Sequence, residues 1–327
     1  MCKRTDEDAS PRDHLQIAKL QITKLHNFMN GVVVIDKPQG LTSHDVVNRV
    51  RRILGQRSVG HLGTLDPSAT GVLPIVTGNF TRLAQFYTHS EKVYEGVIRF
   101  GFATDTYDAD GEPTTAACDV RLDVEQLRAL AADFRGVMEQ VPPPFSAKKI
   151  AGLPAYKLAR KRQEVTLKPV KVEIKELEIV AADNEVNADR ARFRARVTSG
   201  TYMRSLAHDM GQRLGCGAHL ASLRRTAVAE FVIEDAHTLE ELEQATQQGS
   251  AEDIFVHPRK LLSQFPSVTA TDENVALIRA GRAVNLPEMS RAPLVKVFRG
   301  QRELIAIATR VAGTLFHAGI VFPGGSD

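Results

Sequence analysis

The alternation of apolar and polar positions predicts a chain of interleaved strands and helices. Residues 31–36, which begin with an apolar run and end with Asp36, are typical of a strand that stops at a Lys-Pro-Gln-Gly turn. Thr42 followed by Asp45 matches a helix capping box, and the apolar positions behind it recur at helical spacing until Gly55. The same patterns predict further elements in the first half of the chain: strands at 72–76 and 92–100, a short helix at 81–87 and a helix that begins after Asp123.

Two alternating strands are predicted near 170–174 and 190–197. In the second strand Phe193, Ala195 and Val197 share one face. The opposite face then carries a row of arginines that solubility alone does not explain: Arg190, Arg192, Arg194 and Arg196. A helix is predicted from about 200 to Gly215, and after Pro266 a separate C-terminal unit with a helix at 271–280 and strands at 294–298, 303–308 and 311–317.

Length and spacing together predict three parts. The 327 residues suit one large domain followed by a small one. Residues 1–28 show neither a clean strand period nor a clean helical period, so we expect an N-terminal extension that is disordered or loosely helical. We place the large domain at 29–264 and the small domain at 265–327.

Composition narrows the class of protein. Hydrophobic residues make up 43% and charged residues 25%, which is ordinary for a globular protein. No apolar run reaches the ~18 residues of a membrane span, and no signal peptide opens the chain. The three separated cysteines form no CxxC pair, which favours reduced thiols in a cytoplasm and argues against structural zinc. A net charge of +3 permits nucleic-acid binding without requiring it.

The stretch from Gly60 to Pro74 is the strongest candidate for chemistry. It is rich in Gly, Thr and apolar residues, and Asp66 lies in its middle. Pro67 disfavours the helical conformation at Asp66, so the carboxylate lies on a turn. Two interpretations remain open from the residues alone: a single nucleophile or base on a rigid turn, or a turn residue that bonds its own backbone.

Several familiar templates are excluded. The chain contains no G-x-S-x-G elbow, no phosphate-binding P-loop and no H-E-x-x-H zinc motif. Residues 104–111 resemble a calcium loop only superficially, because both end ligands are missing. The remaining candidate groups lie on turns and at the ends of elements: Asp66, Tyr94, Asp108, Tyr202 and Arg204.

The Asp66 stretch resembles the signature of TruB-type pseudouridine synthases. The resemblance rests on Gly60-His61, Gly63, Leu65-Asp66-Pro67 and the Ala-Thr-Gly-Val-Leu-Pro run at 69–74. Further matches follow in the family's order: Lys92-Val-Tyr94, residues 104–111, residues 145–148, residues 200–204 and residues 215–219 with 223–225. The resemblance covers residues 29–237 strongly. It implies an α+β pseudouridine-synthase fold, with a central mixed, largely antiparallel sheet flanked by helices, and a small β-rich PUA-like RNA-binding domain at the C-terminus.

The resemblance also implies a function. Enzymes of this family convert uridine-55 in the T-loop of tRNA to pseudouridine, acting on a flipped-out base. It implies Asp66 as nucleophile, Tyr94 under the base and Arg204 as the ion-pair partner of Asp66, which we expect to be bidentate. Whether the carboxylate attacks C1′ or C6, or helps to form a glycal, stays open. We expect no metal, no cofactor and no guide RNA, and a cytoplasmic monomer whose partner is the tRNA T-arm rather than an obligate protein.

Five further positions are expected to contact or support the substrate. His61 would fill the space left by flipped bases, and Tyr202 and Leu223 would line the pocket. Asp108 would share Arg204 and orient it. Arg82 stands where the family commonly has lysine, and it keeps the positive charge.

The basic stretches at 142–149 and 156–162, together with the arginine face at 190–196, would contact tRNA phosphates. Two alternatives accompany this hypothesis. One is a tRNA-binding or tRNA-folding factor that uses the same fold without turnover. The other is a guide-dependent relative that acts on ribosomal RNA.

Overall fold

The computed structural model describes residues 29–121, 123–145, 149–150, 153–154, 167–182 and 189–323. The predicted extension at 1–28, the basic stretch at 156–162 and part of the stretch at 142–149 lie outside these residues. In the described part of the chain, no helix is long and apolar enough to cross a membrane.

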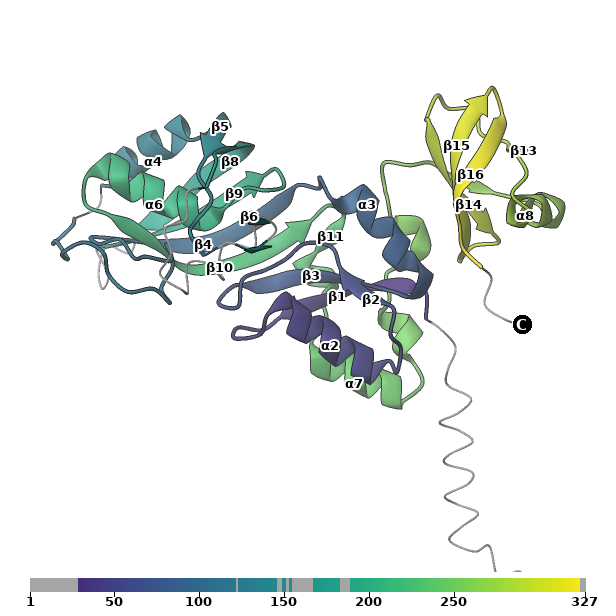
Figure 1. Ribbon diagram of the computed structural model, residues 1–327, viewed down its shortest axis with the longest axis horizontal. Coiled ribbons are helices and arrows are strands. Elements are labelled where there is room, and N and C mark those ends of the chain that lie inside the picture. The colour runs from purple at the N-terminus through teal and green to yellow at the C-terminus, as the bar shows by residue number, and fades with distance from the viewer. Residues whose placement is uncertain are drawn as a thin grey trace, which may run out of the picture.

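A nine-stranded sheet forms the centre of the large domain (Figure 1). Its main path runs β1-β3-β10-β4-β9-β8-β5, with β2 on β3 and β11 on β10. The pairing of β3 with β10 is parallel and the other pairings of this sheet are antiparallel, which confirms the predicted mixed, largely antiparallel sheet. The strands are β1 (Gly31–Lys37), β2 (Val59–His61), β3 (Thr70–Thr77), β4 (Lys92–Phe100), β5 (Gly136–Gln140), β8 (Val170–Ala182), β9 (Arg190–Val197), β10 (Ala218–Val228) and β11 (Phe231–Val232). A separate two-stranded antiparallel sheet pairs β6 (Lys149–Ile150) with β7 (Leu153–Pro154).

Four helices bury one face of this sheet. Helix α2 (Ser43–Ile53) begins at the predicted capping box, in which Thr42 and Asp45 satisfy each other's backbone N–H groups. It lies beside α7 (Leu239–Gln247), while α4 (Val124–Asp133) packs on β8 and α6 (Met203–Leu214) packs on β10 (Figure 1). One continuous apolar core joins these helices to the strands, with residues such as Val33, Val50, Leu73, Phe193, Leu206 and Leu242.

The opposite face is covered at one end and open at the other. Over β1 and β3 it packs against η1 (Gly78–Leu83), α3 (Ala84–Tyr87) and the segment around Leu261. Over β4 and β9 it carries exposed charges, because Arg192, Arg194 and Arg196 alternate with buried neighbours, as predicted for this strand. Short 3-10 turns then lead toward the C-terminus: η2 (Ile233–Asp235), η3 (Ala251–Ile254) and η4 (Pro258–Lys260).

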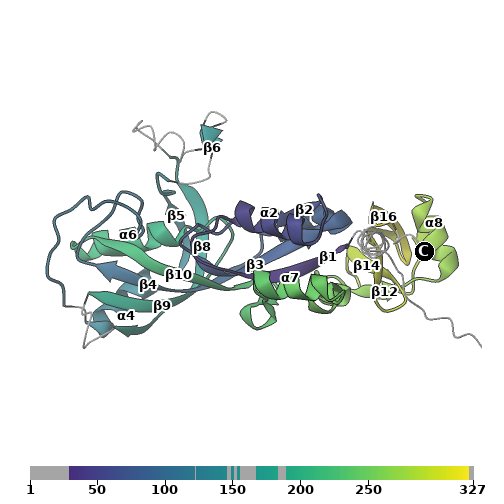
Figure 2. The same ribbon diagram turned by 90° about the horizontal axis from the view of Figure 1, so that it is seen from below.

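The C-terminal domain is a five-stranded sheet in the order β12-β14-β15-β16-β13 with one helix against it (Figure 2). The predicted single strand at 311–317 is wrong. Strand β15 continues to Ala312, and a turn at Gly313, with φ 50°, separates it from β16. Alternation of side chains cannot reveal a turn that interrupts it by two residues. The elements are β12 (Ser267–Thr269), α8 (Asp272–Arg279), β13 (Val284–Asn285), β14 (Leu294–Arg299), β15 (Glu303–Ala312) and β16 (Leu315–Val321).

The two domains share an apolar cluster and several polar contacts. The ring of Phe80 meets that of Phe322 edge-on, with centroids 5.1 Å apart. Arg82 Nη1 donates to the Val321 carbonyl at 2.8 Å, and the buried Lys296 Nζ donates to the Leu261 carbonyl at 2.6 Å. The C-terminal sheet is therefore docked on the large domain rather than merely tethered to it.

Candidate active site

The Asp66 turn connects β2 to β3 and is shaped by two glycines. Gly63 and Gly71 have φ values of 120° and 100°, which residues with a side chain rarely adopt. A Cβ on Gly71 would lie 2.2 Å from the backbone oxygen of Arg225. Glycine is therefore required where β3 and β10 begin their parallel pairing.

Arg225, in the second half of β10, bonds both ends of this turn to the sheet. Its guanidinium is fully buried and donates to the carbonyls of Gly63 at 3.0 Å, Thr64 at 3.1 Å and Val72 at 2.9 Å. Because three backbone acceptors match one planar donor group, the loop has little freedom to move.

Lys37 and Ser43 hold the centre of the turn. Lys37 Nζ, on a fully buried side chain, donates to the Pro67 carbonyl at 3.2 Å and the Leu41 carbonyl at 2.7 Å. Burial lowers the pKa of Lys37 to about 8, with Asp66 opposing the shift and Arg225 adding to it. Ser43 Oγ accepts from the Leu65 N–H at 2.8 Å.

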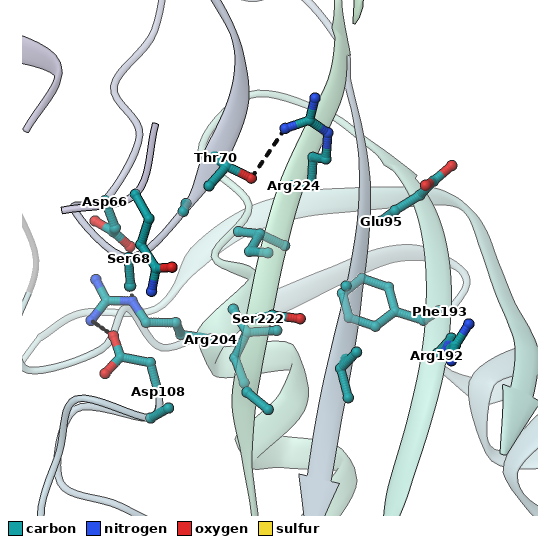
Figure 3. Close-up of a pocket in the computed structure, with 18 of the residues that line it drawn as sticks. Asp66, Ser68, Thr70, Glu95, Asp108, Arg192, Phe193, Arg204, Ser222 and Arg224 are labelled. Carbon is teal, nitrogen blue, oxygen red and sulfur yellow. Dashed lines mark hydrogen bonds and ion pairs between the residues drawn. The ribbon is translucent and has the colours of Figure 1, made fainter. Parts of the chain in front are cut away.

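Arg204, in the first turn of α6, faces Asp66 and divides its donors among four groups (Figure 3). Its side chain is 9% exposed, and its Nε lies 3.0 Å from Asp66 Oδ2. Nη1 lies 3.3 Å from Asp108 Oδ2 and donates to the Thr106 carbonyl at 3.1 Å, while Nη2 donates to the Phe145 carbonyl at 2.9 Å. The expected sharing of Arg204 between Asp66 and Asp108 is present, but the pairing with Asp66 is through Nε rather than bidentate.

Asp66 does not bond the backbone of its own turn. Within the described residues its carboxylate pairs with Arg204, and the side chain remains 44% exposed. The backbone of the turn is satisfied separately, because the Asp66 carbonyl accepts from the Ala69 N–H at 3.1 Å. The geometry thus leaves a carboxylate oxygen accessible on a rigid support, which favours the chemical interpretation of the turn.

Asp108 is itself fixed. Its Oδ1 accepts from Thr106 Oγ1 at 2.6 Å and from the Asp110 N–H at 3.1 Å. Its backbone carbonyl accepts from Thr104 Oγ1 at 2.7 Å. The loop that superficially resembles a calcium site instead presents one carboxylate to Arg204. Among the described residues, no group of three or more His, Cys, Asp or Glu side chains could hold a metal ion.

A cavity of about 330 Å³ opens beside Asp66. Burial raises the pKa of Tyr202, an effect that Arg204 opposes and Asp66 reinforces. Tyr94, from β4, is 7% exposed, and its ring packs in the main core. The walls of this cavity bring together five of the side chains singled out in the sequence: Asp66, Tyr94, Tyr202, Arg204 and Leu223.

A second, larger cavity of about 820 Å³ shares Asp66 and Arg204 with the first and extends over the open face of the sheet (Figure 3). Its floor is a cross-strand row of alternating charge. Arg224 on β10 lies opposite Glu95 on β4, which lies opposite Arg194 on β9. Asp66 therefore stands where a small pocket meets a broad polar groove.

His61 and Arg82 line neither of these cavities. His61 lies on β2, where its Nδ1 accepts from the Gly63 N–H at 3.3 Å, and burial, with Arg225 and His44 adding, lowers its pKa. Arg82 lies at the junction with the C-terminal domain. The structure thus brings Asp108 and the five cavity residues together, keeps His61 at the edge of the same turn, and places Arg82 apart from them.

Three basic residues that support the site were missed in the sequence: Lys37, Lys92 and Arg225. Lys92 lines the 330 Å³ cavity, where burial and Arg225 lower its pKa to about 8. Lysine and arginine are usually solvated, so their presence alone did not mark them. Signals were nevertheless present. Lys37 ends the strand that begins at Gly31, and Lys92 and Arg225 lie in the matched motifs at 92–94 and 223–225.

Lys92 should contribute measurably to the pH dependence of the free energy of unfolding. Its folded pKa of about 8 lies below the unfolded value, so the unfolded chain binds the extra proton and stability should rise as pH rises from about 8 toward 10. We expect this rise to be smaller by about 1 kcal/mol in Lys92→Met, after allowance for partial solvent screening. Denaturant unfolding of both chains at pH 8 and pH 10 measures the difference, and parallel curves would contradict the assignment.

Comparison with known proteins places the chain in a family. A model of the N-terminal domain of TruB family pseudouridylate synthases matches residues 51–203, and a model of the tRNA pseudouridylate synthase B C-terminal domain matches residues 204–264. A tRNA pseudouridine synthase B from Solibacter usitatus is 50% identical over 90% of this chain and 100% of its own length. The protein of the same name from Bacillus cytotoxicus is 39% identical over 85% of this chain and 92% of its own.

Solved structures share the fold. A Cbf5–Nop10–Gar1 complex contains a chain with a TM-score of 0.65 and 26% identity, covering 92% of this chain and 86% of that chain. An H/ACA RNP bound to a substrate RNA containing 2′-deoxyuridine gives a TM-score of 0.66 at 24% identity, covering 93% of this chain and 87% of that chain, and shows likeness of fold alone. These matches agree with the predicted pseudouridine-synthase fold and with a β-rich, PUA-like C-terminal domain. The chain belongs to the TruB family of pseudouridylate synthases.

Proposed function

We propose that this protein converts uridine-55 in the T-loop of tRNA to pseudouridine, with Asp66 as the nucleophile on a flipped-out base. Membership of the family supports pseudouridine formation in tRNA, since relatives named for that activity match almost the whole chain. The observation that carries the catalytic proposal is the accessible Asp66 carboxylate, held on a rigid turn and paired with Arg204 at the wall of a 330 Å³ cavity.

The reaction needs few groups. The N1–C1′ bond of the uridine breaks, the uracil rotates, and a C5–C1′ bond forms as the C5 proton leaves and N1 takes up a proton. Nothing is oxidised or reduced, so a nucleophile, a cation to position it, a surface for the free base and a group near C5 to take the proton suffice. Attack of Asp66 at C1′, attack at C6 and assistance to a glycal all use the same carboxylate, and the proposal does not distinguish them.

The walls of the cavity suggest the other roles. Arg204 balances the charge of Asp66 and fixes its direction, and Asp108 holds Arg204 in place. Tyr94 offers a flat face to the uracil and a phenol near C5, where a proton must leave. Tyr202 and Leu223 supply the remaining walls.

The target nucleotide must leave its stack before it can enter the cavity. His61 belongs to the same turn as Asp66, so it is the side chain that we propose fills the vacated space. Arg82, at the junction with the C-terminal domain, would contact a more distant part of the same tRNA. In this proposal residues 265–327 act as the PUA-like RNA-binding domain and residues 29–264 as the catalytic domain.

We further propose that the protein acts as a cytoplasmic monomer, without guide RNA, metal, cofactor or obligate protein partner. The relatives named tRNA pseudouridine synthase B are 39–50% identical, whereas the chains from H/ACA and Cbf5 complexes are 24–26% identical. This difference favours tRNA over the guide-dependent alternative. Turnover by the purified chain on a bare tRNA transcript would separate the two directly.

The deciding experiment uses a tRNA transcript that carries tritium at C5 of its uridines, because pseudouridine formation releases that label to water. We expect release by the wild-type chain, and no release when uridine-55 alone is replaced by cytidine. Tight binding without release would establish the folding factor instead. Release that persists in the cytidine-55 transcript would contradict the assignment of position 55.

The open face of the sheet should contact phosphate. Arg194 lines the groove beside Asp66 and is exposed. Arg194→Ala should therefore weaken tRNA binding a few-fold, and it should reduce by about one the steepness with which the logarithm of the binding constant falls with the logarithm of salt concentration. Arg128→Ala is the matched control, because Arg128 is an exposed arginine on α4 that pairs with Glu125 and lines neither cavity. Filter binding between 50 and 200 mM salt measures both, and identical slopes would contradict the phosphate contact.

A further inference from the structure

Two aromatic rings stack between α6 and the loop that follows β4. The rings of Tyr107 and His208 have centroids 3.8 Å apart and planes inclined by only 11°. Tyr107 belongs to the loop after β4, and His208 lies on α6 one turn beyond Arg204. Burial lowers the pKa of His208, and burial together with Asp209 raises that of Tyr107, so two uncharged rings stack at neutral pH.

The backbone at Tyr107 is unusual. Its φ of 65° lies in the left-handed region, which a bulky residue rarely occupies unless its surroundings hold it there. Thr106 and Asp108, on either side of Tyr107, both meet Arg204: the Thr106 carbonyl accepts from Nη1 at 3.1 Å, and Asp108 Oδ2 lies 3.3 Å from the same atom. The strained residue is thus the one between two contacts to the guanidinium.

We propose that the Tyr107–His208 stack is a positioning device that keeps Arg204 aimed at Asp66. The inference rests on the proposed function, because it concerns the rate of that reaction. His208 and Arg204 are four residues apart on α6, so the stack and the guanidinium contacts link the same loop to the same side of one helix. Neither ring lines the two cavities that contain Asp66, so the pair acts through Arg204 and not on the substrate.

Without the stack, the loop keeps its polar links to the sheet and to itself, and it meets α6 through the Arg204 guanidinium. The Leu220 N–H donates to the Tyr107 carbonyl at 3.0 Å, and Thr104 Oγ1 donates to the Asp108 carbonyl at 2.7 Å. These two bonds hold the backbone in register but do not reach α6, so the guanidinium contacts would no longer be supported by a second contact between loop and helix. Loss of either ring should therefore loosen Arg204 while the fold and the RNA-contacting groove remain.

Four variants test the proposal: Tyr107→Phe, Tyr107→Gly, His208→Ala and the double variant Tyr107→Gly/His208→Ala. Phenylalanine keeps the stack, and glycine removes it while accepting the positive φ, so the loop can still form. We expect single-turnover tritium release to slow about three- to tenfold in Tyr107→Gly and His208→Ala, the range for one lost aromatic contact. We expect Tyr107→Phe to match the wild type, the double variant to be no slower than the slower single variant, and the tRNA Kd to stay unchanged.

A second readout does not depend on turnover. The Nε–H NMR signal of Arg204, assigned by its loss in Arg204→Lys, should stay sharp in Tyr107→Phe and broaden in Tyr107→Gly and His208→Ala. An unchanged release rate and an unchanged NMR signal in Tyr107→Gly and His208→Ala would overturn the proposal. An equal loss of rate in Tyr107→Phe, or variants that lose only affinity for tRNA, would overturn it as well. A wild-type chain without tritium release would instead overturn the proposed function, and the NMR comparison would still decide whether the stack positions Arg204.

Discussion

Asp66→Asn is expected to abolish turnover, slowing tritium release by more than about 10³-fold, while tRNA affinity stays within a few-fold. The amide has nearly the same shape as the carboxylate but cannot act as an anionic nucleophile. Binding should survive because Gly63, Thr64 and Val72 remain tied to Arg225 through backbone carbonyls, which the substitution does not touch.

The matched control is Asp133→Asn, an exposed carboxylate at the end of α4 that lines neither cavity. Its release rate and tRNA Kd should equal those of the wild type. Single-turnover release and filter binding on the same preparations separate chemistry from affinity. If Asp66→Asn lost binding and turnover in equal measure, Asp66 would be a structural turn residue and the mechanism proposed for it would be wrong.

Arg204→Lys is expected to slow release by at least about 10²-fold although it keeps the positive charge. The guanidinium spans four acceptors in different directions, from the Asp66 and Asp108 carboxylates to the carbonyls of Thr106 and Phe145. A lysine ammonium is a compact point charge without the planar fork, so it cannot satisfy all four at once. With 9% of the side chain exposed, the contacts that lysine leaves unmade would be costly.

Arg128→Lys on the exposed surface of α4 provides the control for the arginine-to-lysine change itself, and its rate should be unaltered. Thermal unfolding of Arg204→Lys checks that the variant is folded at the assay temperature. A near-normal release rate in a folded Arg204→Lys would remove the ion pair from the mechanism. It would leave Asp108 as a carboxylate with no demonstrated part in positioning Asp66.

Much of the local structure could be predicted because its causes are local. The capping box of Thr42 and Asp45 starts α2 where expected, since the two side chains satisfy backbone groups three residues apart. Period-two alternation placed the exposed arginines of β9 correctly, because successive side chains of any strand point to opposite faces. The strand predicted at 311–317 was wrong because a two-residue turn leaves that alternation almost intact.

The candidate site was only partly predictable, because some of its contacts join segments that are far apart in the sequence. Asp66, Tyr94 and Arg204 could be selected as reactive groups on turns and element ends, and the order of the motifs indicated the family. The expected sharing of Arg204 between Asp66 and Asp108 is present in the structure. The bonds of Arg204 to the carbonyls of Thr106 and Phe145 could not be predicted, because they depend on how distant loops pack on α6. The position of Arg82 at the domain junction could not be predicted either, because its acceptor is the carbonyl of Val321, far away in the chain.

The sequence by itself determined the order and type of most elements, the glycine and proline geometry of the Asp66 turn, and the family. Tertiary structure alone decided which charges are buried and what they hold. Arg225 binds carbonyls that precede it by more than 150 residues, and Lys37 binds one that follows it by 30. Such contacts form only once distant segments have packed and excluded water, and burial then turns ordinary basic residues into the supports of the site.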